Sequence, residues 1–146
     1  MNISTTRFGT LAINAADIIV FPDGMLGLGD CLRWVLLADS LGDSLGWLQS
    51  VDQPQLALAV VSPRRFVPGY EVRLARSELQ PLALESLQDA HVLVTVSKHE
   101  ETITLNLKAP LIINMQRRMG RQAISNGDQP IQYPLTSEQT THKRSA

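Results

Sequence analysis

The residue types that most often bind metals or carry catalysis are few in this chain and far apart in the sequence. The chain has three histidines, His91, His99 and His142, and a single cysteine, Cys31. A zinc site needs several such ligands that converge on one point, and the chain contains no His-Glu-x-x-His motif. Capping or solvent-exposed roles suit the histidines better, and Cys31 has the character of a small buried apolar residue. The sequence predicts no metal site.

The acidic and glycine-rich segments also lack a catalytic pattern. Glu100 and Glu101 are adjacent, so their side chains diverge and do not form an acid–base pair. The glycines from Gly24 to Gly29 do not have the spacing of a dinucleotide-binding loop, and no Gly-x-Ser-x-Gly elbow or Walker loop occurs. We therefore expect a protein that is not an enzyme and that uses no cofactor. Only a deep pocket with perturbed carboxylates or histidines would favour an enzyme.

Arginines form the most basic feature of the sequence. Arg117, Arg118 and Arg121 cluster around Gly120, and Arg64 with Arg65 adds a second pair. Arginine can clamp phosphates and stack on bases. However, the formal net charge is −1, and aromatic residues make up only 5% of the chain. We expect no direct nucleic-acid partner. The alternative function is a small β-barrel that binds a ligand or RNA through these arginines.

Two segments combine aromatic and polar residues in a way that suits a protein-binding surface. Trp47 is followed by Gln49 and Asp52, and a Pro-Gly turn precedes Tyr70 and Glu71. Amphipathic aromatic residues beside polar side chains are typical of interfaces. The structural alternative is that Trp47 belongs to the core and that Asp52 helps to build a turn. The sequence leaves both interpretations open.

The elements that would position these residues are short apolar runs separated by turn-forming residues. The clearest pair is His91 to Ser97 and Thr102 to Leu107, joined by a polar link. In the second run the odd-numbered residues are apolar and the even-numbered ones polar, which is the alternation of a half-buried strand. Pro81 allows only a short helix between 77 and 87. We predict a mainly β fold, namely a small antiparallel β-barrel-like single domain with one or two short helices.

Length and composition fit this architecture. A chain of 146 residues with 44% hydrophobic content can bury one core without disulfides. We predict a domain over residues 1–135 and a polar, mobile tail over 136–146. The N-terminus lacks the pattern of a signal peptide, and no apolar stretch reaches the ~20 residues of a membrane helix. We expect a cytoplasmic protein with no membrane partner.

Several motifs, taken in order, resemble the FliW family of flagellar assembly factors. The resemblance runs from about Ile18 to Leu135, and the ordered set is far more specific than any single block. The blocks are Ile19-x-Phe21-x-x-Gly24-x-x-Gly27, Trp47-Leu48-Gln49-Ser50-Val51-Asp52-x-Pro54, Leu58-Ala59-Val60-Val61-Ser62-Pro63, Phe66-x-Pro68-x-Tyr70-Glu71, Val94-Thr95-Val96, Asn106-Leu107-x-Ala109-Pro110-Leu111-Ile112-Ile113-Asn114 and Gly120-x-Gln122. Two positions depart from the family pattern, because Leu26 stands where a proline is usual and Leu28 where an aromatic is common.

The resemblance implies a non-enzymatic regulator with two protein partners. Members of the family bind the translational repressor CsrA and thereby relieve its repression of flagellin messenger RNA. They also bind flagellin, which competes for them as it accumulates. Within the matched blocks we expect Gln49, Asp52, Tyr70 and Glu71 to face a partner. Structural roles remain the alternative for each: Asp52 and Pro54 would build a turn, and Asn106 and Asn114 would cap strand ends.

Overall fold

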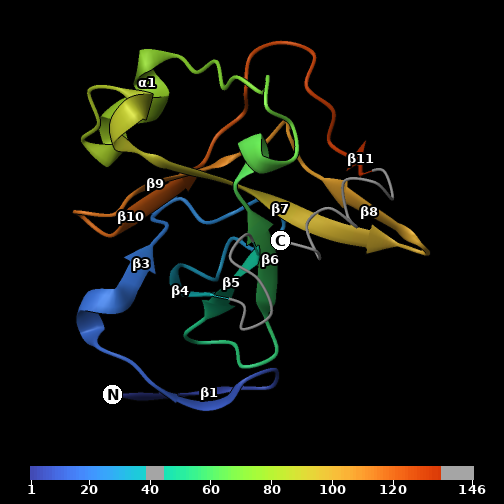
Figure 1. Cartoon of the computed structure of the whole chain (residues 1–146). Helices are drawn as coiled ribbons and strands as arrows, with labels where there is room; N and C mark the ends of the chain where they lie inside the picture. The colour runs from blue at the N-terminus through green and yellow to red at the C-terminus, as the bar shows by residue number, and fades with distance from the viewer. Residues whose placement is uncertain (39–44, 136–146) are drawn as a thin grey trace.

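A computed structural model describes residues 1–38 and 45–135 of the chain, and the predicted tail over 136–146 lies outside the described residues. The described part is mainly β (Figure 1). Its strands are β1 (Asn2–Thr5), β2 (Gly9–Ala12), β3 (Ile18–Val20), β4 (Arg33–Ala38), β5 (Leu45–Ser50), β6 (Ala57–Val61), β7 (His91–His99), β8 (Thr102–Leu105), β9 (Leu111–Asn114), β10 (Met119–Gln122) and β11 (Tyr133–Pro134).

Seven of these strands close into a barrel, which confirms the predicted fold class. Neighbouring strands follow the order β7, β6, β5, β4, β3, β10 and β9, and β9 pairs back onto β7. All these pairings are antiparallel except one, because β3 and β10 run parallel and meet at Val20 and Met119. Closure of the sheet removes free edges within the barrel.

Strand β7 is the longest strand, and it connects the barrel to a peripheral pair of strands. Residues 91–93 pair with β9, whereas residues 96–99 pair with β8, which in turn carries β11. The predicted hairpin is confirmed, with His99 opposite Thr102. One detail of the predicted alternation is wrong: Thr104 is buried, because Pro134 of β11 lies directly opposite it.

The barrel core forms around the fully buried Trp34 of β4, whose indole N–H donates to the carbonyl oxygen of Cys31 at 3.1 Å. Phe21 is also fully buried, and its ring lies against Gly120, where there is no room for a side chain. The largest core cluster further contains Ile19, Leu48, Leu111 and Ile113. Apolar residues from β3, β4, β5, β6 and β9 therefore meet inside the barrel.

Strands β1 and β2 form a separate hairpin outside the nine-stranded sheet (Figure 1). Ile3 of this hairpin is buried in a cluster with Ile13 and Val35. The turn of the hairpin reaches Trp47 of β5: the Phe8 ring meets the tryptophan edge-on at 6.1 Å, and the Arg7 guanidinium lies 4.1 Å from its ring centroid. The hairpin thus covers a tryptophan that the barrel leaves half-buried.

The helical segments of the described residues are short. The α-helix α1 spans Arg76–Leu79, and the 3-10 helices are η1 (Ala15–Asp17), η2 (Pro63–Arg65), η3 (Gln80–Leu82) and η4 (Leu87–Asp89). Pro81 lies in η3, directly after α1, as expected for a residue that stops helix propagation. No helix of the described residues is long and apolar enough to cross a membrane.

Candidate partner-binding surface

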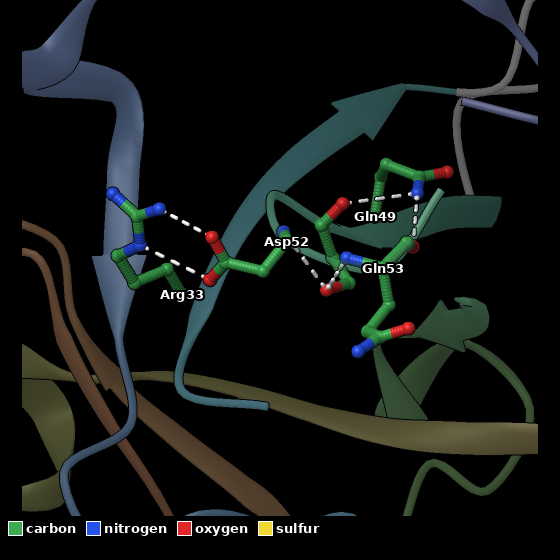
Figure 2. A network of polar contacts seen from close by, with 5 residues as sticks. Arg33, Gln49, Asp52 and Gln53 are labelled. Atoms are coloured by element: carbon green, nitrogen blue, oxygen red, sulfur yellow. Dashed lines mark hydrogen bonds and ion pairs between the residues drawn. The ribbon is translucent and has the colours of Figure 1, made fainter. Parts of the chain in front are cut away.

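The loop between β5 and β6 is built from within by Gln49, as Figure 2 shows. The Gln49 side chain is fully buried at the end of β5. Its amide nitrogen donates toward the carbonyl oxygens of Ser50 at 3.0 Å, Leu56 at 3.1 Å, Pro54 at 3.3 Å and Gln53 at 3.4 Å. A single side-chain amide therefore contacts backbone carbonyls along the whole loop and holds the loop folded over β5.

Ser50 fixes the first turn of the same loop. Its hydroxyl oxygen accepts the backbone N–H groups of Gln53 at 3.0 Å and Asp52 at 3.3 Å, and the hydroxyl itself is buried. Serine hydroxyls cap turns in this way. The N–H of Thr6 in the β1–β2 turn donates to the Pro54 carbonyl at 2.8 Å. The loop is thereby held in one conformation that exposes residues 52–55 to solvent.

Asp52 forms an ion pair with Arg33, the first residue of β4. The Arg33 Nε donates to Asp52 Oδ2 at 3.1 Å, and a second guanidinium nitrogen donates to Oδ1 (Figure 2). These hydrogen bonds lower the pKa of Asp52 and raise that of Arg33. The two side chains are 45% and 46% exposed, so solvent screens the pair. The ion pair offsets the negative charge of Asp52 within the protein itself.

Tyr70 does not lie on the surface. Only 3% of the residue is exposed, and its hydroxyl donates to the carbonyl oxygen of Leu107 at 2.7 Å. Burial disfavours the phenolate and raises the pKa of Tyr70 to about 12. The contact joins the segment after η2 to the segment that follows β8. Tyr70 thus has a structural role.

Glu71, in contrast, is exposed. Its side chain is 68% accessible, and its nearest cation is Arg73 at 3.6 Å. Glu71 borders an open cleft of about 510 Å³ together with Arg64, Leu87, Gln88 and Val92. Asp52 precedes strand β6, whereas Glu71 follows it, beyond η2. The two exposed carboxylates therefore stand at different ends of that strand.

Two of the four expected partner-facing positions need correction. Gln49 is buried because the loop that it organises folds back over it, and Tyr70 is buried because its ring packs with Leu105 and Leu107. Neither side chain is available to a partner in this conformation. Asp52 and Glu71 are exposed, as a partner contact requires, and their role remains a prediction. Asn106 and Asn114 each accept two backbone N–H groups just beyond β8 and at the end of β9, so the structural alternative of capping strand ends holds for both.

The arginines proposed for the alternative function are partly occupied by other contacts. Arg121 forms ion pairs with Asp23 at 2.7 Å and Glu78 at 3.3 Å, and so ties the loop after β3 to α1. Arg64 donates to the Tyr70 carbonyl at 3.3 Å. These contacts reduce the positive charge that is available to a phosphate backbone. Across residues 1–38 and 45–135, no group of three or more metal-binding side chains comes together.

Arg33 is the ion-pair partner of Asp52 that sequence reasoning missed. Nothing in its immediate sequence marks it, because Arg33 and Asp52 are far apart along the chain. The signal lies in strand register: Trp34 pairs with Ser50, so the residue before Trp34 comes close to the residues after Ser50. The pair could have been found only after β4 and β5 were aligned.

Comparison with known proteins agrees with this architecture. The family model described as FliW protein matches residues 2–135. The chain belongs to the FliW family. It is 35% identical to the flagellar assembly factor FliW of Natranaerobius thermophilus over an alignment of 150 positions, which covers 100% of this chain and 99% of the relative. It is 37% identical to the FliW of Geobacter sulfurreducens, with 87% of this chain and 80% of the relative covered.

A solved structure supports the family at the level of the fold. The crystal structure of the flagellar assembly factor FliW superposes with a TM-score of 0.84 at 30% sequence identity, covering 94% of this chain and 99% of that chain. The resemblance inferred from the ordered motifs is therefore confirmed. The departures at Leu26 and Leu28 do not disturb the fold: Leu26 is 68% exposed, and Leu28 packs partly buried against the main core cluster.

Proposed function

We propose that this chain is a cytoplasmic, non-enzymatic flagellar assembly factor that binds the translational repressor CsrA and also binds flagellin. The observation that carries the proposal is the match to FliW proteins over nearly the whole chain, in sequence and in fold. The curated relatives are named flagellar assembly factors. Binding of CsrA would relieve repression of flagellin translation, and flagellin would compete for the same protein.

The rigid β5–β6 loop supports a role in binding. A loop whose backbone is fixed by Gln49 and Ser50 loses little conformational entropy when a partner docks on it. Its exposed residues include the carboxylate of Asp52, whose charge Arg33 partly offsets, and Glu71 adds a second exposed carboxylate beside a cleft. Carboxylates suit a basic partner such as an RNA-binding repressor. We infer that both positions lie at or near partner contacts.

A pull-down with purified CsrA and purified flagellin tests the proposal directly. We expect this chain to form a complex with each partner at micromolar concentration. Failure to form either complex with a correctly folded preparation would overturn the proposal. The same preparation is titrated with RNA at low and high salt. Salt-dependent RNA binding by the isolated chain would instead favour the arginine-based alternative.

Charge reversal at the two exposed carboxylates tests the surface. Asp52→Lys places a second cation beside Arg33, and Glu71→Lys places one beside Arg73. We expect each variant to weaken CsrA binding roughly five- to tenfold, or about 1 kcal/mol, mainly through slower association. Glu101→Lys, at the exposed β7–β8 turn, is the matched control with the same change in charge. Equal affinities for all four proteins would remove Asp52 and Glu71 from the interface.

A further inference from the structure

One of the five asparagines in this chain is followed by a glycine. Asn126 precedes Gly127, whereas the other four asparagines, Asn2, Asn14, Asn106 and Asn114, precede Ile, Ala, Leu and Met. Asn126 and Gly127 lie in an exposed bend between β10 and β11. The backbone nitrogen that follows an asparagine can attack the side-chain amide, and a glycine offers no side chain to hinder that attack.

The surroundings of this bond leave the reaction path open. Gly127 has a φ of +108°, and a Cβ placed there would meet no atom within 4 Å. Among the described residues, neither the Asn126 side chain nor the Gly127 N–H makes a hydrogen bond. Asn106 and Asn114 provide the contrast, because the Oδ1 of each accepts two backbone N–H groups that hold the amide in place.

We propose that Asn126–Gly127 is a site of spontaneous covalent modification, namely deamidation to aspartate and isoaspartate. The backbone nitrogen of Gly127 loses its proton and bonds to the side-chain carbonyl carbon of Asn126. The bond from that carbon to Nδ2 then breaks, and ammonia leaves with the proton, so that a cyclic succinimide remains. Water opens the ring at either carbonyl and yields aspartate or isoaspartate. No oxidant, metal or enzyme is required.

The site is placed where isoaspartate would disturb a neighbouring segment. The Lys108 ammonium group donates to the carbonyls of Ser125 at 2.9 Å and Gly127 at 2.8 Å, and thus spans Asn126. The Asn126 N–H donates to the Arg73 carbonyl at 2.7 Å, and the Arg73 N–H donates to the Ser125 hydroxyl at 3.3 Å. Isoaspartate lengthens the backbone by one carbon, so these four contacts cannot all persist. The segment that would loosen carries Glu71.

The modification is tested on the purified full-length chain under native conditions. The protein is incubated at mildly alkaline pH, below its unfolding temperature, and sampled over days. Peptide mapping by mass spectrometry and labelling with isoaspartyl methyltransferase follow each asparagine. We expect Asn126 to convert progressively while Asn106 and Asn114 stay amides, and we expect Asn126→Gln to abolish the isoaspartyl label in the peptide that carries position 126. An unchanged Asn126, or a label that survives in the peptide of position 126 in Asn126→Gln, would overturn the proposal.

Two further measurements complete the test. One asks whether the folded bend permits the reaction, and the other asks whether the longer backbone, and not the added charge, loosens the segment. If Asn126 converts only after unfolding in urea, the native bend protects it and the proposal fails for the folded protein. Hydrogen exchange at Arg73 and Asn126 then reports the structural consequence in aged protein. We expect faster exchange there than in fresh protein or in Asn126→Asp, which adds the charge without lengthening the backbone. Equal exchange in all three samples would contradict the predicted loosening.

Discussion

Replacement of Tyr70 by phenylalanine tests the conclusion that this residue holds the fold together. Tyr70→Phe keeps the ring but removes the hydroxyl that donates to the Leu107 carbonyl at 2.7 Å. That carbonyl then loses the one donor that the described residues supply, and a buried acceptor without a donor costs about 1–3 kcal/mol. For a chain of 146 residues this corresponds to a fall in Tm of roughly 3–9 °C.

The difference in stability between wild type and Tyr70→Phe should also depend on pH, which gives a more specific test. The pKa of Tyr70 is about 12 in the folded protein, against an ordinary value of 10.0. Folding favours the neutral phenol. The stabilisation of the folded state that this preference provides is present below pH 10 and is lost as the pH rises toward 12. Between pH 9 and pH 11 the loss amounts to about 1 kcal/mol, because one pKa unit corresponds to about 1.4 kcal/mol. The phenylalanine variant cannot undergo this loss.

Urea denaturation followed by tryptophan fluorescence at pH 7, 9 and 11 measures both effects. We expect wild type to be more stable than Tyr70→Phe at pH 7, and the difference to shrink by about 1 kcal/mol at pH 11. Tyr133→Phe is the matched control, because the Tyr133 hydroxyl has no hydrogen-bond partner among the described residues. A constant difference between wild type and Tyr70→Phe across this range would refute the reasoning.

Two further substitutions probe the core and the exposed ion pair. Gly120→Ala would place a Cβ 2.5–2.8 Å from the buried Phe21 ring, so we expect it to destabilise the fold by about 1–3 kcal/mol in urea denaturation, whereas Gly69→Ala, where no atom lies within 4 Å, should have little effect. Asp52→Asn should cost less than about 1 kcal/mol at pH 7, because the Arg33–Asp52 pair is half-exposed. Since the pKa of Asp52 is lowered, this contribution disappears as the pH falls below 3.8, and a wild-type advantage that persisted at lower pH would contradict the assignment.

The strands were predictable from sequence because each is an apolar run bounded by turn-forming residues. The hairpin of β7 and β8 shows the principle, since local alternation and a short link define it almost completely. Closure of the barrel was not predictable in the same way. It depends on the parallel contact between Val20 and Met119, and no local pattern records a pairing between segments so distant in the chain.

The two tryptophans show a similar limit of prediction from sequence. Both lie on strands that pair with each other, and sequence alone drew attention to Trp47. The structure buries Trp34 completely and leaves Trp47 to be covered by Arg7 and Phe8. Which tryptophan enters the core depends on strand register and on an N-terminal hairpin that packs outside the main sheet. Neither determinant can be read from the residues beside the tryptophan.

The prediction for Gln49 failed for a related physical reason. A polar residue at the end of a strand, followed by Ser50 and Asp52, has the pattern of an exposed edge. The chain instead turns back over β5, and the carbonyls of the loop provide acceptors for the Gln49 amide. A buried polar residue is stable where its hydrogen bonds are supplied by nearby backbone. Sequence shows the polarity of such a residue but not where its partners lie.

Residues in the matched blocks can therefore be separated by what they contact. Gln49 and Ser50 shape the β5–β6 loop, Tyr70 anchors the segment after η2, and Asn106 and Asn114 cap strand ends. Each of these side chains directs its hydrogen bonds at the backbone of the chain itself and so serves the framework of the fold. The contact residues should thus be sought among the exposed side chains that this framework holds in place, beginning with Asp52 and Glu71. This distinction separates the residues that build the family's fold from the residues that a partner would contact.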